Sequence, residues 1–395
     1  MPQTHLCYPQ ILLRSQFSND LSSLLGATFL GGEADDAAHS ISVDGQGRVF
    51  VAGDTSASYN NTDGATYGSF PTTTGAFQEN LSGCHHAFVS RFDSNLSSLQ
   101  ASSLVGLPGY NCGYSNGRGY VVGVDLLLDG TGRPYLAGWA NSSGLPVRGG
   151  FQAIYKSSLN YYDLFVLRLD ANLSDVQAVT YLGDTGSSWD SDYPSPDLAL
   201  DPEGNVFITA TVGSGSMPLS VDAYNPIFNQ DTYLYAATDA YIAKLTPGLD
   251  HLLYGTFLGG KGYDTVLGLA VDPNGQMLVT GQTRDTGDPA GNFPTTAGAF
   301  DTHVGEGRED VFVSKLDIPE NLVVSVKGPT IMIPGERADF ILTYKNALKT
   351  TARNVVIVAD LPKELAFVTT GNGGTFNTTG RCDNQMYWLM GDLAP

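Results

Sequence analysis

Charge is scarce in this sequence, and positive charge above all. Only 15% of the 395 residues are charged, and 20 Lys and Arg stand against 40 Asp and Glu, which gives a formal net charge of −20. Proteins bind nucleic acid and anionic membrane surfaces through clusters of Lys and Arg, and the sequence contains no such cluster. We therefore expect neither as a partner.

Long hydrophobic runs and metal-type cysteine spacings are missing as well. No apolar stretch approaches the ~18 residues of a membrane-spanning helix, so no membrane insertion is expected. Residues 1–20 hold Pro9 and a short apolar stretch where a signal peptide has its core, so a secretion signal is expected to be missing or already removed. The four cysteines form no CxxC pair, which disfavours a zinc or redox motif and leaves two disulfides as an interpretation.

The residues that are abundant indicate β-structure. The chain has 47 Gly, 20 Pro, 10% aromatic and 42% hydrophobic residues. Short strands joined by tight turns have this profile, whereas helix bundles need long runs of Ala, Glu, Lys and Leu, and disordered chains are poorer in hydrophobic residues. We predict a globular all-β protein that is long enough for more than one domain.

Six Asn-x-Ser/Thr sequons are typical of an exported chain. Such sites carry glycans in secreted proteins, and together with the acidic, Lys-poor composition they favour an extracellular or cell-surface location. The candidate glycosylation sites are Asn60, Asn80, Asn95, Asn141, Asn172 and Asn377.

A fourfold repeat organises most of the chain. The segments ISVDGQGRVFVAG, LLLDGTGRPYLAG, LALDPEGNVFITA and LAVDPNGQMLVTG align on Asp44, Asp129, Asp201 and Asp272. In each segment two apolar runs flank a turn in which Asp caps the backbone, so the four aspartates are interpreted as turn formers rather than as catalysts. Two further series, of the AFVSRFD and TFLGG types, complete each unit to four predicted strands, as in a β-propeller blade.

The two ends of this array are incomplete in a complementary way. The fourth unit lacks its last strand after Asp317, and the first segment, Leu21 to Gly32, is a last strand with no unit before it. We predict that Leu25–Leu30 pairs with Val311–Leu316 and closes a four-bladed propeller, because closure removes exposed sheet edges.

These motifs resemble the SBBP-type β-propeller repeat. The matching features are TFLGG at Thr28 and at Thr256, FPTTTGAF from Phe70, FPTTAGAF from Phe293, and the strands HAFVSRFD and DVFVSKLD. The second and third units have diverged in the loop. The resemblance covers roughly residues 21–317 and implies a β-propeller there.

Residues 318–395 have a different pattern. Period-two runs such as ADFILTYKN and NVVIVADLP, broken by Gly and Pro, predict an antiparallel sandwich. The I-P-G-E turn at Ile333, the T-Y-x-N strand at Thr343, NVVIVADLP from Asn354 and W-x-x-G-D-L-A-P from Trp388 are similar to an Ig-like repeat of bacterial and archaeal surface proteins. That resemblance implies another strand after L-A-P, so the sandwich is expected to lack its last strand.

A sandwich with an open edge accepts a strand from another molecule, as in donor-strand complementation. The candidate donor is the N-terminal extension, residues 1–20, with its apolar side chains Tyr8, Ile11, Leu13 and Phe17. Head-to-tail docking that does not close into a ring builds an open filament. A plain fragment boundary is the alternative interpretation.

The cysteines are assigned to two bonds on this basis. Cys84 and Cys112 lie in loops of neighbouring units and are predicted to pair within the chain. Cys7, in the donor segment, and Cys382, in the Ig-like domain, are predicted to pair between chains. Free thiols or pairing within one chain is the alternative for this second pair.

Catalytic and cofactor motifs are absent. No histidine pair has a metal-ligand spacing, neither a G-x-S-x-G elbow nor a P-loop is present, and His85 and His86 alternate direction on a strand. We expect no cofactor. Calcium is kept as a candidate ligand of the acidic loops Trp189–Asp192 and Asp285–Asp288. The Phe-Pro-Thr-Thr loops are interpreted as packing motifs, with a carbohydrate-binding surface as the alternative.

Two functions from different classes follow. The first is a non-catalytic extracellular structural protein, either a cell-surface module or a filament subunit that assembles with copies of itself by β-strand addition. The alternative is a secreted carbohydrate- or ligand-binding propeller that acts as an adhesin. A propeller hydrolase is disfavoured, because the sequence shows no acid/base constellation.

Overall fold

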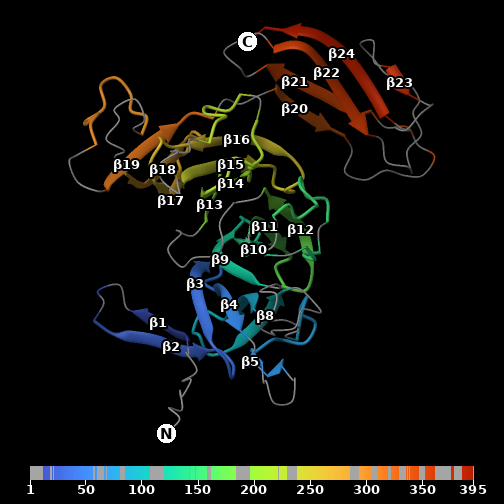
Figure 1. The fold of residues 1–395 in the computed structure, drawn as a ribbon. Coiled ribbons are helices and arrows are strands. Elements are labelled where there is room, and N and C mark those ends of the chain that lie inside the picture. The colour runs from blue at the N-terminus through green and yellow to red at the C-terminus, as the bar shows by residue number, and fades with distance from the viewer. Residues whose placement is uncertain are drawn as a thin grey trace. The chain divides into compact units, whose positions relative to one another are not determined.

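The computed structural model consists of β-strands and the turns that join them (Figure 1). It describes residues 12–17, 20, 22–56, 58–59, 66–67, 69–80, 85–106, 120–141, 143–146, 148–157, 162–183, 196–220, 222–228, 238–284, 293–304, 309–318, 322–328, 335, 337, 339–346, 352–360, 375–377 and 385–394. Every regular element in this part of the chain is a strand, which confirms the predicted all-β class. Among these residues, no helix has the length and hydrophobicity needed to cross a membrane.

The chain divides into two compact units between Asp317 and Ile318, and each is described by itself. The larger unit contains three four-stranded antiparallel sheets followed by one of three strands. The first two sheets are β3 (Asp36–Val43), β4 (Val49–Ser56), β7 (His85–Phe92), β8 (Leu99–Val105) and β9 (Val121–Leu128), β10 (Pro134–Ala140), β11 (Asp163–Leu169), β12 (Val176–Leu182). The third and fourth are β13 (Asp197–Leu200), β14 (Val206–Val212), β15 (Asp239–Leu245), β16 (Leu252–Leu258) and β17 (Asp264–Val271), β18 (Met277–Thr283), β19 (Asp310–Leu316).

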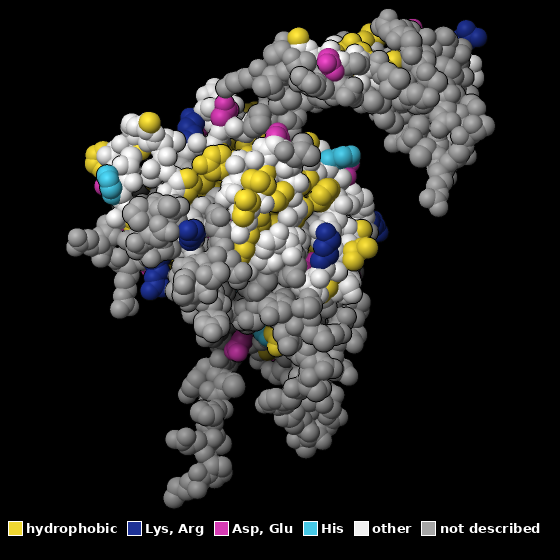
Figure 2. All heavy atoms as spheres, turned by 45° about the horizontal axis from the view of Figure 1, so that its top comes forward, with side chains coloured by type: hydrophobic (Ala, Val, Ile, Leu, Met, Phe, Trp, Pro, Cys, Tyr) yellow, Lys and Arg dark blue, Asp and Glu magenta, His cyan; other side chains and the backbone are white. Residues whose placement is uncertain are grey.

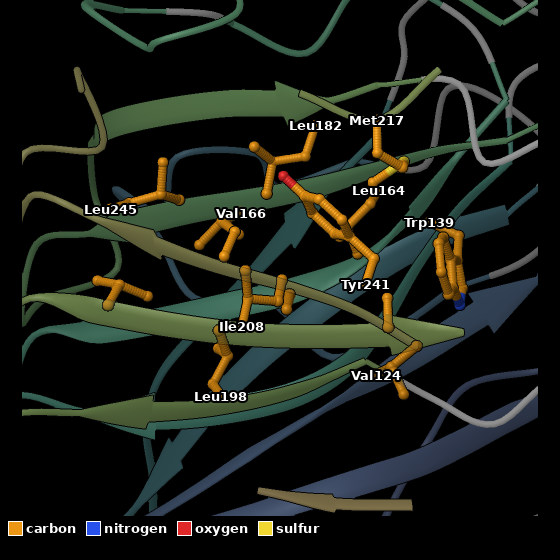
Figure 3. Close-up of a cluster of buried hydrophobic side chains, with 14 of the residues drawn as sticks. Val124, Trp139, Leu164, Val166, Leu182, Leu198, Ile208, Met217, Tyr241 and Leu245 are labelled. Atoms are coloured by element: carbon orange, nitrogen blue, oxygen red, sulfur yellow. The ribbon is translucent and has the colours of Figure 1, made fainter. Parts of the chain in front are cut away.

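The strand order in these sheets follows the order along the chain, as the fourfold repeat predicts. Four consecutive sheets of this kind are consistent with a β-propeller-like architecture. Two hydrophobic clusters pack neighbouring sheets together. One joins the first and second sheets, and the other joins the second and third through side chains such as Leu164, Val166, Ile208 and Tyr241 (Figure 3).

The expected closure is not formed in this structure. Strand β1 (Leu12–Phe17) pairs antiparallel with β2 (Leu24–Leu30) as a separate two-stranded ribbon, with Leu12 opposite Leu30. Among the described strands β19 pairs with β18 alone, so Leu25–Leu30 does not pair with Val311–Leu316. Strands β1 and β2 are adjacent in sequence, so their pairing costs less loop-closure entropy than a pairing of the two ends of the unit.

Two smaller features complete the fold. Strands β5 (Ser58–Tyr59) and β6 (Thr66–Tyr67) form a short ribbon in the larger unit. The described residues of the smaller unit form two antiparallel sheets. One pairs β20 (Leu322–Lys327) with β21 (Ile341–Asn346), and the other pairs β22 (Ala352–Asp360) and β23 (Thr375–Asn377) with β24 (Gln385–Leu393). The Asn346 side-chain amide donates to the Leu393 carbonyl oxygen at 2.7 Å and joins these two sheets.

Candidate functional site

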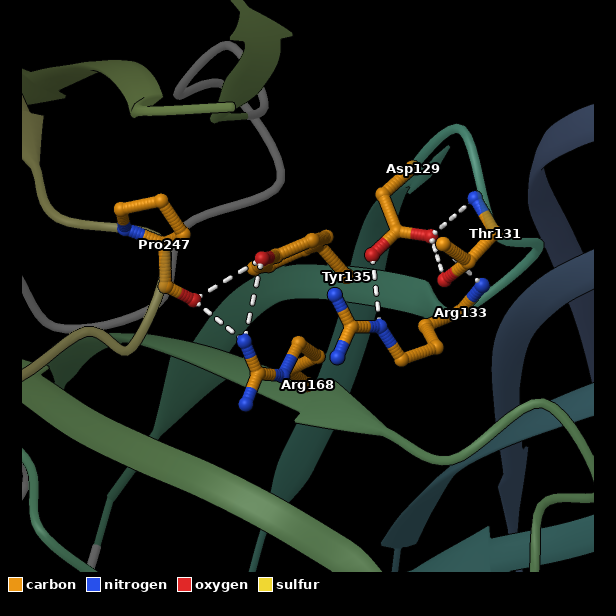
Figure 4. Close-up of polar contacts among 6 residues, drawn as sticks. All are labelled: Asp129, Thr131, Arg133, Tyr135, Arg168 and Pro247. Carbon is orange, nitrogen blue, oxygen red and sulfur yellow. Dashed lines mark hydrogen bonds and ion pairs between the residues drawn. The ribbon is translucent and has the colours of Figure 1, made fainter. Parts of the chain in front are cut away.

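The four repeated aspartates lie in the turns between the first two strands of each sheet. At Asp129, one carboxylate oxygen accepts the Thr131 and Arg133 backbone N–H groups at 2.8 and 3.0 Å, and the other accepts Arg133 Nε at 2.7 Å (Figure 4). Gly132 closes the turn with a φ of 80°, which favours glycine. Asp44, Asp201 and Asp272 accept the equivalent pairs of backbone N–H groups. Each carboxylate therefore accepts hydrogen bonds from its turn and contacts a basic side chain, as expected of a turn-forming residue.

Polar contacts tie each sheet to the next one. Arg168 Nη1 and the Tyr135 hydroxyl, both of the second sheet, donate to the Pro247 carbonyl oxygen of the third at 2.6 and 2.9 Å (Figure 4). In the equivalent position, Arg91 of the first sheet donates to the Ala171 carbonyl oxygen of the second. The arginine of the RFD and RLD motifs therefore donates a hydrogen bond to a turn of the following sheet.

Carboxylates also connect the first strands of neighbouring sheets. Asp125 accepts the Leu198 backbone N–H at 2.8 Å, and Asp197 accepts the Leu269 backbone N–H at 2.7 Å. Ser40 of the first sheet donates to Asp125 at 2.8 Å, which extends the row to a third junction. Burial, with the negative charge of Asp125, raises the pKa of Asp197 to about 6. These carboxylates therefore join neighbouring sheets and are not available as a set of ligands for a metal ion.

Sequence reasoning missed two buried aspartates, Asp36 and Asp264. Each accepts the backbone N–H of a glycine four residues earlier, from Gly32 at 2.7 Å and from Gly260 at 2.6 Å. Burial raises the pKa of both carboxyls above the ordinary value, to about 6 at Asp264, against hydrogen bonds that lower it. The available signal was the shared G-G-x-x-x-D spacing of the first and fourth units.

A histidine and carboxylate cluster lies on the first sheet. Asp54 is 2.6 Å from His39 Nε2 and 3.8 Å from His85 Nδ1. Burial raises the pKa of Asp54, but the hydrogen bonds and charges of the two histidines outweigh it and hold that pKa below its usual range. Burial also lowers the pKa of the adjacent His86 to about 4. Within the described ranges, no three His, Cys, Asp or Glu side chains are arranged to hold a metal ion.

Exposed apolar side chains lie on strands at both ends of the sheet array, and we name these two sets the first and last end faces. The first end face consists of Leu25 and Phe29 of β2 with Ile41 and Val43 of β3, and the last end face consists of Leu267 of β17 with Val311 and Val313 of β19. Figure 2 shows hydrophobic side chains grouped on the molecular surface, with Lys and Arg scattered singly. Grouped apolar exposure marks interaction surfaces in soluble proteins. The two end faces are the candidate functional site.

Several predicted site residues lie outside the described residues. They are all four cysteines, the acidic loops proposed for calcium, the donor residues Tyr8 and Ile11, and the sequon Asn60. The donor residues Leu13 and Phe17 lie on β1, opposite Phe29 and Leu24 of their own chain. Residues 12–17 of the N-terminal extension are therefore paired with β2 here, which is the arrangement that donor-strand exchange into a neighbouring sandwich would have to undo.

The sequons differ in accessibility. Asn80, Asn95 and Asn172 are exposed. Asn141 is only 5% exposed, and its side-chain oxygen accepts the Tyr120 backbone N–H at 2.8 Å. Its side chain is buried in the folded chain, and the other three are the accessible candidates.

The Phe-Pro-Thr-Thr loops begin with a buried ring. Phe70 packs on Phe88 with ring centroids 4.4 Å apart, and Phe293 packs on Phe312 at 4.1 Å. The ring that ends the fourth loop, Phe300, is fully exposed. The first aromatic of each loop is thus a packing residue, as interpreted. Of the last aromatics, Phe300 faces solvent, whereas Phe77 is partly buried against the cluster that joins the first and second sheets.

Comparisons with known proteins give little to add to this geometry. No protein-family model matches the chain, and no curated protein matches it. A solved structure titled "NanB plus Optactamide" is similar with a TM-score of 0.25 and 10% identity, over 69% of this chain and 56% of that one. A likeness this weak carries no argument about fold or activity.

Proposed function

We propose that this chain is a non-catalytic extracellular structural protein, a cell-surface module or filament subunit that associates with copies of itself by β-strand addition. The observation that carries the proposal is the pair of uncovered end faces, together with the unpaired edge of β19 among the described strands. An exposed strand edge with apolar side chains is a template for another strand. Natural proteins cover such edges, so this one is expected to be covered in the working state.

The resemblances read from the sequence support the same proposal. We take the four sheets as SBBP-type propeller blades, the last of which has three strands among the described residues, and the smaller unit as an Ig-like domain. Motifs of that domain lie on antiparallel strands, with the T-Y-x-N motif on β21 and NVVIVADLP beginning on β22. The exposed sequons and the net charge of −20 favour an extracellular location.

The test is the assembly state of the purified chain. Light scattering and negative-stain images over a wide concentration range are expected to show growth beyond the 41.9 kDa chain into fibres. Non-reducing and reducing gels, run in parallel, report whether Cys7 and Cys382 link chains covalently. A chain that stays a monomer at every concentration contradicts the proposal.

One observation favours the alternative, a carbohydrate-binding adhesin. The ring of Phe300 is fully exposed, and exposed aromatic rings can stack on sugar rings. Under this alternative, Phe300→Ala abolishes binding of the chain to a glycan array without changing its assembly. Under the structural proposal, the wild-type chain shows no glycan binding for this substitution to abolish.

A further inference from the structure

The third sheet shows what the fourth sheet lacks. Its last two strands, β15 and β16, read DAYIAKL and LLYGTFL, and they pair with Ile242 opposite Thr256 and Tyr241 opposite Phe257. Strands β19 and β2 read DVFVSKL and LLGATFL. The two pairs match position by position, so β19 and β2 have the sequences of a pair that forms elsewhere in the same chain.

Burial differs sharply between these matched positions. Ile242 and Phe257 are 0% exposed, whereas their counterparts Val313 and Phe29 are 75% and 64% exposed. Burying an apolar side chain of this size is favourable, so both counterparts gain from the contact that the third sheet already makes.

The β1–β2 ribbon also needs another partner. A lone two-stranded sheet is marginally stable at best in water, and β1 covers only one edge of β2. The other edge of β2 remains available to β19. Adding the ribbon to β19 would extend the fourth sheet from three strands to five.

Within the described residues, the loop that ends at Phe300, at the same end of the array, lacks a hydrogen bond that the loops of the first two units make. The last aromatic of the first two loops donates its backbone N–H to a leucine carbonyl oxygen of the following sheet, Phe77 to Leu173 at 2.9 Å and Phe151 to Leu249 at 2.8 Å. Phe300 holds this position in the fourth loop. The equivalent leucine is Leu96 of the first sheet, which has a φ of 59° where Leu173 and Leu249 have 60° and 59°.

The last end face therefore matches a first end face, which lies on the β1–β2 ribbon and the first sheet. Within the described part of the chain both end faces are exposed at once, and β2 does not pair with β19. We infer that the β1–β2 ribbon and first sheet of one copy dock on the fourth sheet of a second copy, with Thr28 opposite the partner's Val313. This inference rests on the proposed self-association and names the surface that performs it.

The contact is head-to-tail, because the first end face of one copy binds the last end face of the next. A head-to-tail contact of this kind closes into a ring if its rotation closes and otherwise builds a filament. The inference holds in both cases.

Cysteine pairing tests the register and the occupant together. Residues directly opposite on antiparallel strands have Cβ atoms about 4.5 to 5.5 Å apart, which is close enough for a disulfide after a small adjustment. Full-length Thr28→Cys and Val313→Cys chains are mixed under oxidising conditions and compared with each variant alone and with wild type. These controls define the background from the four native cysteines.

The expected result is a reducible two-chain band that is found only in the mixture. A Thr28→Cys/Val313→Cys double variant is then expected to give a ladder of chains. A cyclised single chain from the double variant, with no new band in the mixture, shows closure within the chain and overturns the inference. Assembly by light scattering without any new cross-link also overturns it while leaving the proposed function in place, whereas absence of assembly removes both.

A surface substitution provides an independent measurement. Val313→Lys places a charge on the last end face, and Ile154→Lys is its control, because Ile154 is 73% exposed and lies outside both end faces. Neither side chain is buried in the single chain, so both variants are expected to fold with the wild-type circular dichroism spectrum. Assembly is expected to fall at least tenfold for Val313→Lys and to be unchanged for Ile154→Lys. Equal assembly of the two variants contradicts the inference.

Discussion

The third and fourth sheets carry the same repeat, yet their side chains have different surroundings. Every residue of β14 is buried, whereas alternate residues of the equivalent β18 are partly buried or exposed. The third sheet packs against the second through a large hydrophobic cluster, and the fourth sheet ends the array. In a repeat array each unit is stabilised by its neighbours, so a terminal unit with one neighbour is the weaker unit. Burial here is a property of position in the array rather than of local sequence.

The same comparison applies to electrostatics. Lys244 and Asp201 of the third sheet are 2.9 Å apart, and so are Lys315 and Asp272 of the fourth sheet. The side chains of the first pair are 15% and 1% exposed, and those of the second pair are 51% and 18% exposed. The two ion pairs therefore differ in strength despite equal distances, because solvent screens the exposed pair.

The largest effect is expected from truncating matched aromatics. Phe257→Ala in the third sheet removes a fully buried ring and is expected to lower the free energy of unfolding by about 3 to 5 kcal/mol. Phe29→Ala at the matched position of β2 is expected to change it by less than about 0.5 kcal/mol, because that ring is exposed in the single chain. Urea denaturation of the dilute, unassembled chain measures both. Equal losses would show that β2 is already buried without a partner copy.

The next effect depends on pH and concerns Asp264. Burial raises its pKa to about 6 from 3.8, so between these values the folded state binds more protons than the unfolded state. The stability that Asp264 contributes is therefore greatest below about pH 4 and is lost as the pH rises through about 6. Replacement by the neutral Asn removes this loss.

Denaturation at pH 4, 5, 6 and 7 measures the Asp264 effect as a difference between proteins. The stability of Asp264→Asn relative to wild type is expected to rise by up to about 3 kcal/mol across this range. Asp301→Asn, at an exposed carboxylate, is the control and is expected to show no such rise. A flat difference for Asp264→Asn contradicts the burial of an ionisable group there.

A smaller effect separates the two ion pairs. Asp201→Ala leaves Lys244 nearly buried without its carboxylate and is expected to cost about 2 to 3 kcal/mol. Asp272→Ala removes the same turn contacts but leaves an exposed lysine, so a smaller loss than that of Asp201→Ala is expected. Thermal denaturation of the two variants side by side gives the ranking, and the reverse ranking would show that the turn, and not the ion pair, dominates.

The smallest effect concerns the junction of the second and third sheets. Tyr135→Phe removes one of the two donors to the Pro247 carbonyl oxygen and keeps the ring, which Phe50 and Phe207 supply at the matching positions of neighbouring sheets. A loss of about 1 kcal/mol is expected, because Arg168 still satisfies the carbonyl. Urea denaturation checks it, and a loss as large as that of Phe257→Ala would mean that the hydroxyl organises the whole junction.

Much of the local structure could be predicted from the sequence. The alternating runs and the Asp-containing turns of the repeat correspond to paired strands and to turns around Asp44, Asp129, Asp201 and Asp272, because strand pleat and turn chemistry act over a few residues. The pairing of β2 with β1 was not predicted, because Leu24–Leu30 has a last-strand sequence whichever strand lies beside it. The buried state of Asp36 and Asp264 and the reach of Arg168 to Pro247 were also missed.

The sequence by itself determined the strands, their turns and the order of the four sheets, since each depends on contacts within one repeat unit. The tertiary structure alone decided which equivalent residues are buried, which carboxyls hold a raised pKa, and where apolar faces are left uncovered. The physical reason is that desolvation depends on what packs against a residue from outside its own unit. Similar local sequences at the middle and at the end of an array therefore have different environments, and the uncovered end is where a partner gains most from binding.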